Sequence, residues 1–173
     1  MIHNLQVGDI VLVHRRFCPV AWLIRKYSGS HYNHAMMAVD GLHVVEMKSL
    51  GVKINPIAKY DNPFLYDFKV LRVVQLSDDE KTRLKRYAYQ GKFVGSYWNF
   101  VRSMVGFVQK RRMFQWSCCN FVNYLFERAD IWLTDHSIYT TPKHIEDSYI
   151  VREVKPIRIG DNIYGRERNR TAL

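Results

Sequence analysis

Residues 116–122 read Trp116-Ser117-Cys118-Cys119-Asn120-Phe121-Val122, and this segment gives the strongest indication of architecture and chemistry in the chain. Ser117 is a good helix N-cap residue, so a helix is predicted from Cys118 to about residue 128. Unpaired backbone N–H groups at a helix start favour the thiolate of a cysteine, which is its nucleophilic form. The same groups can stabilise an oxyanion during acyl transfer. Cys118 is therefore the candidate nucleophile, and Ser117 is a candidate oxyanion or substrate contact.

Helix periodicity separates the two adjacent cysteines. The apolar stripe at spacing i, i+3, i+4, i+7 consists of Cys118, Phe121, Val122 and Leu125. A more polar stripe consists of Cys119, Asn123 and Glu127. We expect Cys118 to face the sheet and Cys119 to lie on the polar side; the alternative is that both are ordinary buried cysteines.

A nucleophilic cysteine needs a base and a group that orients the base, and a predicted hairpin supplies candidates for both. His34 begins a strand over residues 34–39, and Glu46 lies in a second strand over residues 42–47. Asp40-Gly41 is a strong hairpin signal. A two-residue loop would put His34 and Glu46 on opposite faces, whereas a three-residue loop or a bulge puts them on one face. We predict the latter; the alternatives are a strand-end histidine at the surface and a glutamate that faces water.

The remaining pattern predicts an α+β fold with a mainly antiparallel sheet. A strand is expected over residues 10–13, a helix over 19–27 closed by Gly29, and a strand over 68–74. Ser77 and Glu80 form a capping-box pattern before a helix to about residue 90, and some helix is expected near 98–108. A short turn or helix starts at Pro142, and a last strand covers 149–154. We expect one catalytic domain over residues 1–160, followed by a basic tail over 161–173.

Composition bounds the location and partners of the chain. Three cysteines, two of them adjacent, argue against a disulfide framework. The N-terminal residues carry no signal pattern and no apolar run could span a bilayer, so a cytoplasmic protein is expected. The net charge of +10 favours anionic partners and gives an alternative function, a basic binding module for nucleic acid or an acidic membrane surface. Aromatic residues are interleaved with basic residues over 107–114, but no nucleic-acid-binding motif is present, so nucleic acid is the less favoured partner.

Four segments together resemble the circularly permuted NlpC-like papain-fold amidases and cysteine peptidases, in the YaeF/YiiX-like branch. The segments are Gly8-Asp9-Ile10-Val11, Gly29-Ser30-His31-Tyr32-Asn33-His34-Ala35, Val44-Val45-Glu46-Met47 and Ser117-Cys118-Cys119-Asn120-Phe121-Val122. Cys119 and Asn120 depart from the residues usual in the last segment. The resemblance implies a sheet or small barrel packed against helices, in which histidine and glutamate precede cysteine along the chain.

The resemblance assigns Cys118 as nucleophile, His34 as base and Glu46 as orienting acid, and Tyr97 is weakly similar to a family tyrosine. It implies cleavage of an amide or (thio)ester bond in a peptide, peptidoglycan or lipid substrate, with possible peripheral membrane contact. No cofactor is expected. A metal site made of His31, His34, Cys118 and Cys119 is a further alternative, disfavoured because adjacent cysteines do not easily ligate one ion. Trp22 and Tyr32 could line an apolar groove, although we favour core positions for them.

Overall fold

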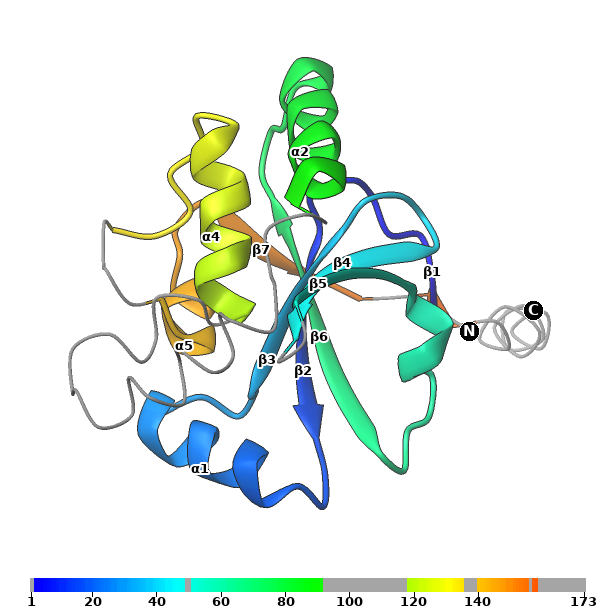
Figure 1. Cartoon of the computed structure of the whole chain (residues 1–173), viewed down its shortest axis with the longest axis vertical. Coiled ribbons are helices and arrows are strands. Elements are labelled where there is room, and N and C mark those ends of the chain that lie inside the picture. The colour runs from blue at the N-terminus through cyan, green and yellow to red at the C-terminus, as the bar shows by residue number, and fades with distance from the viewer. Residues whose placement is uncertain (1, 49–50, 92–117, 136–139, 156, 159–173) are drawn as a thin grey trace, which may run out of the picture.

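The computed structural model describes residues 2–48, 51–91, 118–135, 140–155 and 157–158, and its centre is a six-stranded antiparallel sheet (Figure 1). The strand order is β5-β4-β3-β2-β6-β7. The strands are β2 (Ile10–Arg15), β3 (His34–Ala38), β4 (His43–Lys48), β5 (Gly51–Pro56), β6 (Tyr66–Val73) and β7 (Val151–Val154). A separate two-stranded pairing joins β1 (Ile2–His3) to β8 (Ile157–Arg158). The predicted class, α+β with a mainly antiparallel sheet, is confirmed.

The predicted helices begin and end close to the residues that the sequence indicates. They are α1 (Pro19–Ser28), α2 (Asp78–Gly91), α4 (Cys118–Arg128) and α5 (Pro142–Glu146), and the structure adds the 3-10 helix η1 (Ile57–Tyr60). Gly29 ends α1 in the left-handed conformation, with φ of 66°, and its N–H bonds to the carbonyl oxygen of Arg25. Ser77 and Glu80 make both hydrogen bonds of the predicted capping box.

The sheet is buried on both faces, and this explains the continuous apolar run in β2. Ile10 and Leu12 belong to the core between the sheet and the helices α2 and α4. Val11 and Val13 belong to a second core, where Ile57 and Tyr60 of η1 cover the opposite face. Figure 1 shows α2 and α4 on one side of the sheet and η1 on the other, with α1 beyond one end of β2.

Several elements were not predicted from the sequence. β5 is an edge strand in which Val52 is buried and Ile54 is only partly buried, with the exposed Lys53 between them, and it ends at Pro56. η1 and the β1–β8 pairing were also missed. The helix expected near 98–108 and the basic tail over 161–173 lie outside the described residues. Among the described residues, no helix is both long enough and apolar enough to cross a membrane.

A buried ion pair holds the start of β2 against β6. Asp9 is 1% exposed and accepts hydrogen bonds from Nε and Nη2 of Arg72, each at 2.8 Å, and from the backbone N–H of Gln6. Two parallel bonds between a guanidinium and a carboxylate are among the strongest side-chain interactions. The pair therefore fixes the Gly8-Asp9 turn that leads into the central strand.

We expect Arg72→Ala to lower the free energy of unfolding by about 3–5 kcal/mol, because it leaves the Asp9 carboxylate buried without a cation. For a chain of this size the melting temperature should fall by roughly 6–20 °C, measured by circular dichroism. The matched control is Arg152→Ala, since Arg152 lies opposite Arg72 on β7 and is exposed. Equal melting temperatures for the two variants would contradict the prediction.

Candidate functional site

The register of the β3–β4 hairpin puts His34 and Glu46 on the same face. Met37 pairs with Val45 and Ala38 with Val44, so the same register sets Met36 opposite Glu46. The Val39 N–H bonds to the His43 carbonyl oxygen at 3.0 Å, which leaves a three-residue loop over 40–42. The Asp40 carboxylate accepts the N–H groups of Leu42 and His43 and stabilises this turn. The predicted three-residue loop is confirmed.

His34 and Glu46 are in direct contact within this hairpin. The His34 Nε2 atom lies 2.9 Å from Oε2 of Glu46, whose side chain is fully buried. The interpretation of Glu46 as a solvent-facing strand residue is therefore wrong. Because Nε2 is engaged by the carboxylate, the other ring nitrogen of His34, Nδ1, is left for a further partner.

That further partner is Cys118, the first residue of α4. The Cys118 thiol and the His34 ring form a side-chain hydrogen bond, and the Ala35 backbone N–H also bonds to the sulfur. Helix α4 packs across β3 and β4, which carries its N-terminus to the start of β3. The structure thus brings together all three residues that the sequence predicted to act together. Glu46 follows His34 by 12 residues along the chain, and Cys118 follows Glu46 by 72.

Cys119 does not lie on a polar side of α4, as the helix phase had indicated. It is 2% exposed, whereas Cys118 is only half-buried. Cys119 belongs to the core that the sheet forms with α2 and α4, so the polar residues on its stripe do not mark an exposed side of the helix. Asn123 on this stripe is also buried, and its amide is satisfied by Glu127 and Thr134.

The electrostatics of the group favour a thiolate–imidazolium pair. A hydrogen bond from the Cys119 thiol, 4.0 Å away, together with the nearby His34 charge, holds the pKa of Cys118 well below its usual value. The hydrogen bond to Cys118, burial and the charge of the Cys118 thiolate raise the pKa of Cys119, so Cys119 stays a neutral S–H donor. Burial alone would lower the pKa of His34, but Cys118 and Glu46 outweigh it and raise this pKa to about 9.

Three further residues hold Glu46, and sequence reasoning missed them. Its Oε1 atom accepts from Asn55 Nδ2 at 2.7 Å and Tyr60 Oη at 2.5 Å, and Lys48 Nζ lies 3.0 Å away. Burial would raise the pKa of Glu46, but the bonds from His34 and Tyr60 and the nearby charges lower it to about 2. Asn55 and Tyr60 belong to β5 and η1, the elements that the sequence did not reveal. The one signal in the sequence that could have revealed these partners of Glu46 is Asn55, a polar residue within a partly apolar segment.

Other predicted site residues are not placed beside this group. Tyr97 and Ser117 lie outside the described residues, as do the basic and aromatic residues over 107–114 that motivated a binding module. Trp22 is 55% exposed, so a core position is wrong for it, while Tyr32 is buried as expected. In the described part of the chain, His31 contacts His14 and Asp67 instead of the cysteines.

The fold and this group define an α+β protein in which a cysteine at a helix N-terminus meets a histidine and a buried glutamate on an antiparallel hairpin. Its fold is similar to that of the metalloprotein yiiX from Escherichia coli O157:H7, with a TM-score of 0.64 over 88% of this chain and 97% of that one. The two sequences are 16% identical, so the likeness shows the fold alone. It agrees with the YiiX side of the resemblance seen in the sequence.

The other comparisons gave no relatives. No protein-family model matches the chain, and no curated protein sequence matches it. The chemistry of the site has therefore to be argued from its own residues.

Proposed function

We propose that the protein is a cysteine hydrolase or acyltransferase with a circularly permuted, NlpC-like papain fold. Cys118 is the nucleophile, His34 the base and Glu46 the residue that orients it. One observation carries the proposal: the Cys118 thiol bonds to an imidazole whose Nε2 lies 2.9 Å from a fully buried carboxylate. Nucleophile, base and orienting acid in contact are the arrangement that acyl transfer requires.

The first half-reaction forms an acyl-enzyme. The Cys118 thiolate attacks the carbonyl carbon of an amide or (thio)ester, and the electron pair of the C=O bond moves to oxygen. Backbone N–H groups in the first turn of α4 are suitably placed to stabilise this oxyanion. As the intermediate collapses, the bond to the leaving group breaks, and the His34 imidazolium gives its Nδ1 proton to that group.

The second half-reaction releases the acyl group. Neutral His34 takes a proton from water, or from another acceptor, as that molecule attacks the thioester carbonyl. The C–S bond then breaks and the Cys118 thiolate returns beside the His34 imidazolium. Glu46 keeps the ring oriented with Nδ1 toward the sulfur throughout, because Nε2 remains bonded to it.

The substrate class follows from this chemistry and from the family resemblance. An amide of a cell-wall peptide and an ester, thioester or amide of a lipid are both proposed substrates. The yiiX protein is described as a metalloprotein, whereas no step of the reaction proposed here uses a metal ion.

The test is an acyl-enzyme mapped by mass spectrometry. Purified protein is incubated with an activated acyl thioester, in separate peptidyl and long-chain acyl forms, and digested. We expect one acyl adduct on the peptide that contains Cys118, absent in Cys118→Ala and retained in Cys119→Ala. Cys18→Ala is the matched control, because Cys18 is a half-buried cysteine beside a helix start, outside this group.

Two results would overturn the proposal. One is equal labelling of the wild type and Cys118→Ala. The other is an acyl adduct that mass spectrometry maps to Cys18 or Cys119 in the Cys118→Ala variant. A preference between the peptidyl and long-chain probes would select the substrate class.

A further inference from the structure

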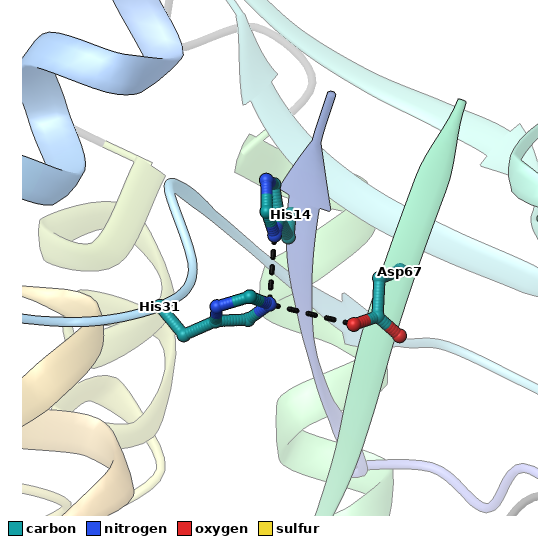
Figure 2. A group of neighbouring side chains, drawn as sticks. All are labelled: His14, His31 and Asp67. Atoms are coloured by element: carbon teal, nitrogen blue, oxygen red, sulfur yellow. Dashed lines mark hydrogen bonds and ion pairs between the residues drawn. The ribbon is translucent and has the colours of Figure 1, made fainter. Parts of the chain in front are cut away.

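A second group of titratable side chains lies away from the cysteines, at one end of the sheet. His14 is on β2, Asp67 lies directly opposite it on β6, and His31 comes from the connection between α1 and β3. Figure 2 shows one nitrogen of the His31 ring joined by dashed lines to both of the other side chains. The mechanism proposed for Cys118 uses none of these three residues.

The donor atoms of the three side chains converge. His14 Nδ1 lies 2.7 Å from His31 Nε2, and Asp67 Oδ2 lies 3.4 Å from that same nitrogen. One ligand atom from each residue falls within 4.8 Å of the others. A hydrogen bond between two imidazole nitrogens needs one shared proton, and removal of that proton leaves two lone pairs that point toward each other across the 2.7 Å gap. An ion that replaces that proton would meet both rings and the carboxylate.

We propose that His14, His31 and Asp67 bind a divalent transition-metal ion, with zinc as the ion best suited to the donor set. Two imidazole nitrogens and one carboxylate oxygen are typical of zinc sites that keep a fourth position for water. Hard cations such as Mg²⁺ and Ca²⁺ prefer more oxygen ligands than this group supplies.

Only small movements are needed to reach tetrahedral geometry. Bonds of about 2.0–2.1 Å put neighbouring donor atoms roughly 3.3 Å apart. Asp67 Oδ2 already lies 3.4 Å from His31 Nε2, whereas the two imidazole nitrogens, 2.7 Å apart, have to move away from each other. The side chains of His31 and Asp67 are 56% and 47% exposed, so both can adjust without disturbing the core. His14 is fixed by its place in β2 and provides the rigid part of the site.

The surrounding charges set an upper limit on affinity. Arg25 and Arg16 lie close enough to His14 to act on it electrostatically, and both disfavour a bound cation. Asp67 supplies the compensating negative charge. We therefore expect a reversible site that fills when metal is supplied.

Metal binding would connect three elements that the chain otherwise joins by loops. The ion would tie the α1–β3 connection, through His31, to β2 and β6. That connection leads within three residues to His34. Because the ion binds the folded form, it should also raise the melting temperature, by roughly 5–10 °C at a free concentration of 100 times the dissociation constant.

The experiment is zinc titration by calorimetry, with melting temperatures measured on the same samples. Thiolates also bind zinc, so the titration is repeated on a Cys118→Ala/Cys119→Ala variant. We expect one ion per chain in the wild type and in this variant, and at least roughly 100-fold weaker binding in His14→Ala, His31→Ala and Asp67→Ala. Cobalt bound to the same protein should show no thiolate-to-metal charge-transfer band.

The matched control is His43→Ala. His43 also contacts a carboxylate, with Nδ1 3.0 Å from Asp40 Oδ2, but no second histidine joins that pair in the described part of the chain. This variant should bind zinc as the wild type does. The metal-free melting temperature of each variant establishes that it is folded, and variants that fail this check are replaced by His31→Gln and Asp67→Asn.

The site would be overturned if zinc binds His31→Ala as tightly as it binds the wild type, if it binds only while Cys118 and Cys119 are present, or if it does not bind at all. If His43→Ala weakened zinc binding as much as the variants of His14, His31 and Asp67 do, zinc would be bound by scattered surface histidines and not by this group.

Discussion

Replacing His34 by alanine is expected to slow acylation of Cys118 by about 10³–10⁴-fold. The variant loses the cation that stabilises the thiolate and the acid that protonates the leaving group. Cys118 sits at the start of α4, so its helix position remains, but the hydrogen bond and charge of His34 do not. The rate constant is measured with the acyl thioester that reports the wild-type reaction, and His43→Ala on the same hairpin should retain the full rate.

The pH dependence follows from the same pair. The pKa of His34 is raised to about 9, so the rate should be flat near neutrality and fall as pH rises through about 9, when the imidazolium loses its proton. The acid limb should lie far below the usual thiol range, because the pKa of Cys118 is depressed. The contribution of His34 to stability has the same sign: it is fully present below about pH 6.5 and is lost as pH rises through about 9.

Alkylation by iodoacetamide separates the role of His34 in ionisation from a structural one. In the wild type the Cys118 peptide should alkylate readily at pH 6, whereas His34→Ala should react slowly at pH 6 and recover at pH 9 to 10 as its thiol ionises. Equal alkylation of the two proteins at pH 6 would show that His34 does not hold the thiolate. Unchanged acylation in His34→Ala would remove it from the site altogether.

Replacing Glu46 by glutamine is expected to have the second largest effect, on both stability and rate. The carboxylate is fully buried and contacts His34, Asn55, Tyr60 and Lys48, so its loss breaks a buried charge network. We expect a loss of roughly 3 kcal/mol in the free energy of unfolding. The acylation rate should fall roughly 100-fold, less than for His34, because the thiolate keeps its imidazole partner.

A shift in the pH profile distinguishes orientation of His34 from general destabilisation. Without the negative charge of Glu46, the pKa of His34 should fall, so the basic limb of the Glu46→Gln profile should move below about 9. Glu153→Gln is the matched control, since Glu153 is an exposed strand carboxylate that pairs with Lys69. A basic limb that stays near 9 in Glu46→Gln would show that this carboxylate does not act on His34.

The elements nearest the site could be predicted because their signals are local. Gly29 fixes the end of α1, the Ser77–Glu80 pattern fixes the start of α2, and Asp40-Gly41 fixes the hairpin. Both strands are buried on both faces, so no apolar alternation sets their register, and the three-residue loop is inferred from the need to bring His34 and Glu46 to one face. The order of His34, Glu46 and Cys118 along the chain, compared with a known family, supplied the rest of the cluster.

What could not be predicted depends on contacts between distant segments. Cys119 is buried in the core between the sheet and the helices, although the sequence of α4 marks its side of the helix as polar. Tyr60 reaches Glu46 only because β5 and η1 fold over the second face of the sheet. His14 and Asp67 carry no shared motif, and the β2–β6 pairing alone makes them neighbours. No periodicity within one element contains this information.

The contact between His34 and Glu46 depends on whether the turn over 40–42 has an odd or an even number of residues. His34 and Glu46 share a face because the turn between their strands has an odd number of residues. Removing or adding one residue would rotate every later β4 side chain to the other face, sending Glu46 toward the helices and Val45 toward η1. Insertions and deletions in this turn should therefore be tolerated during evolution only two residues at a time, or where a bulge restores the odd number. The exposed residue at the tip of the turn, Leu42, is by contrast free to change its side chain.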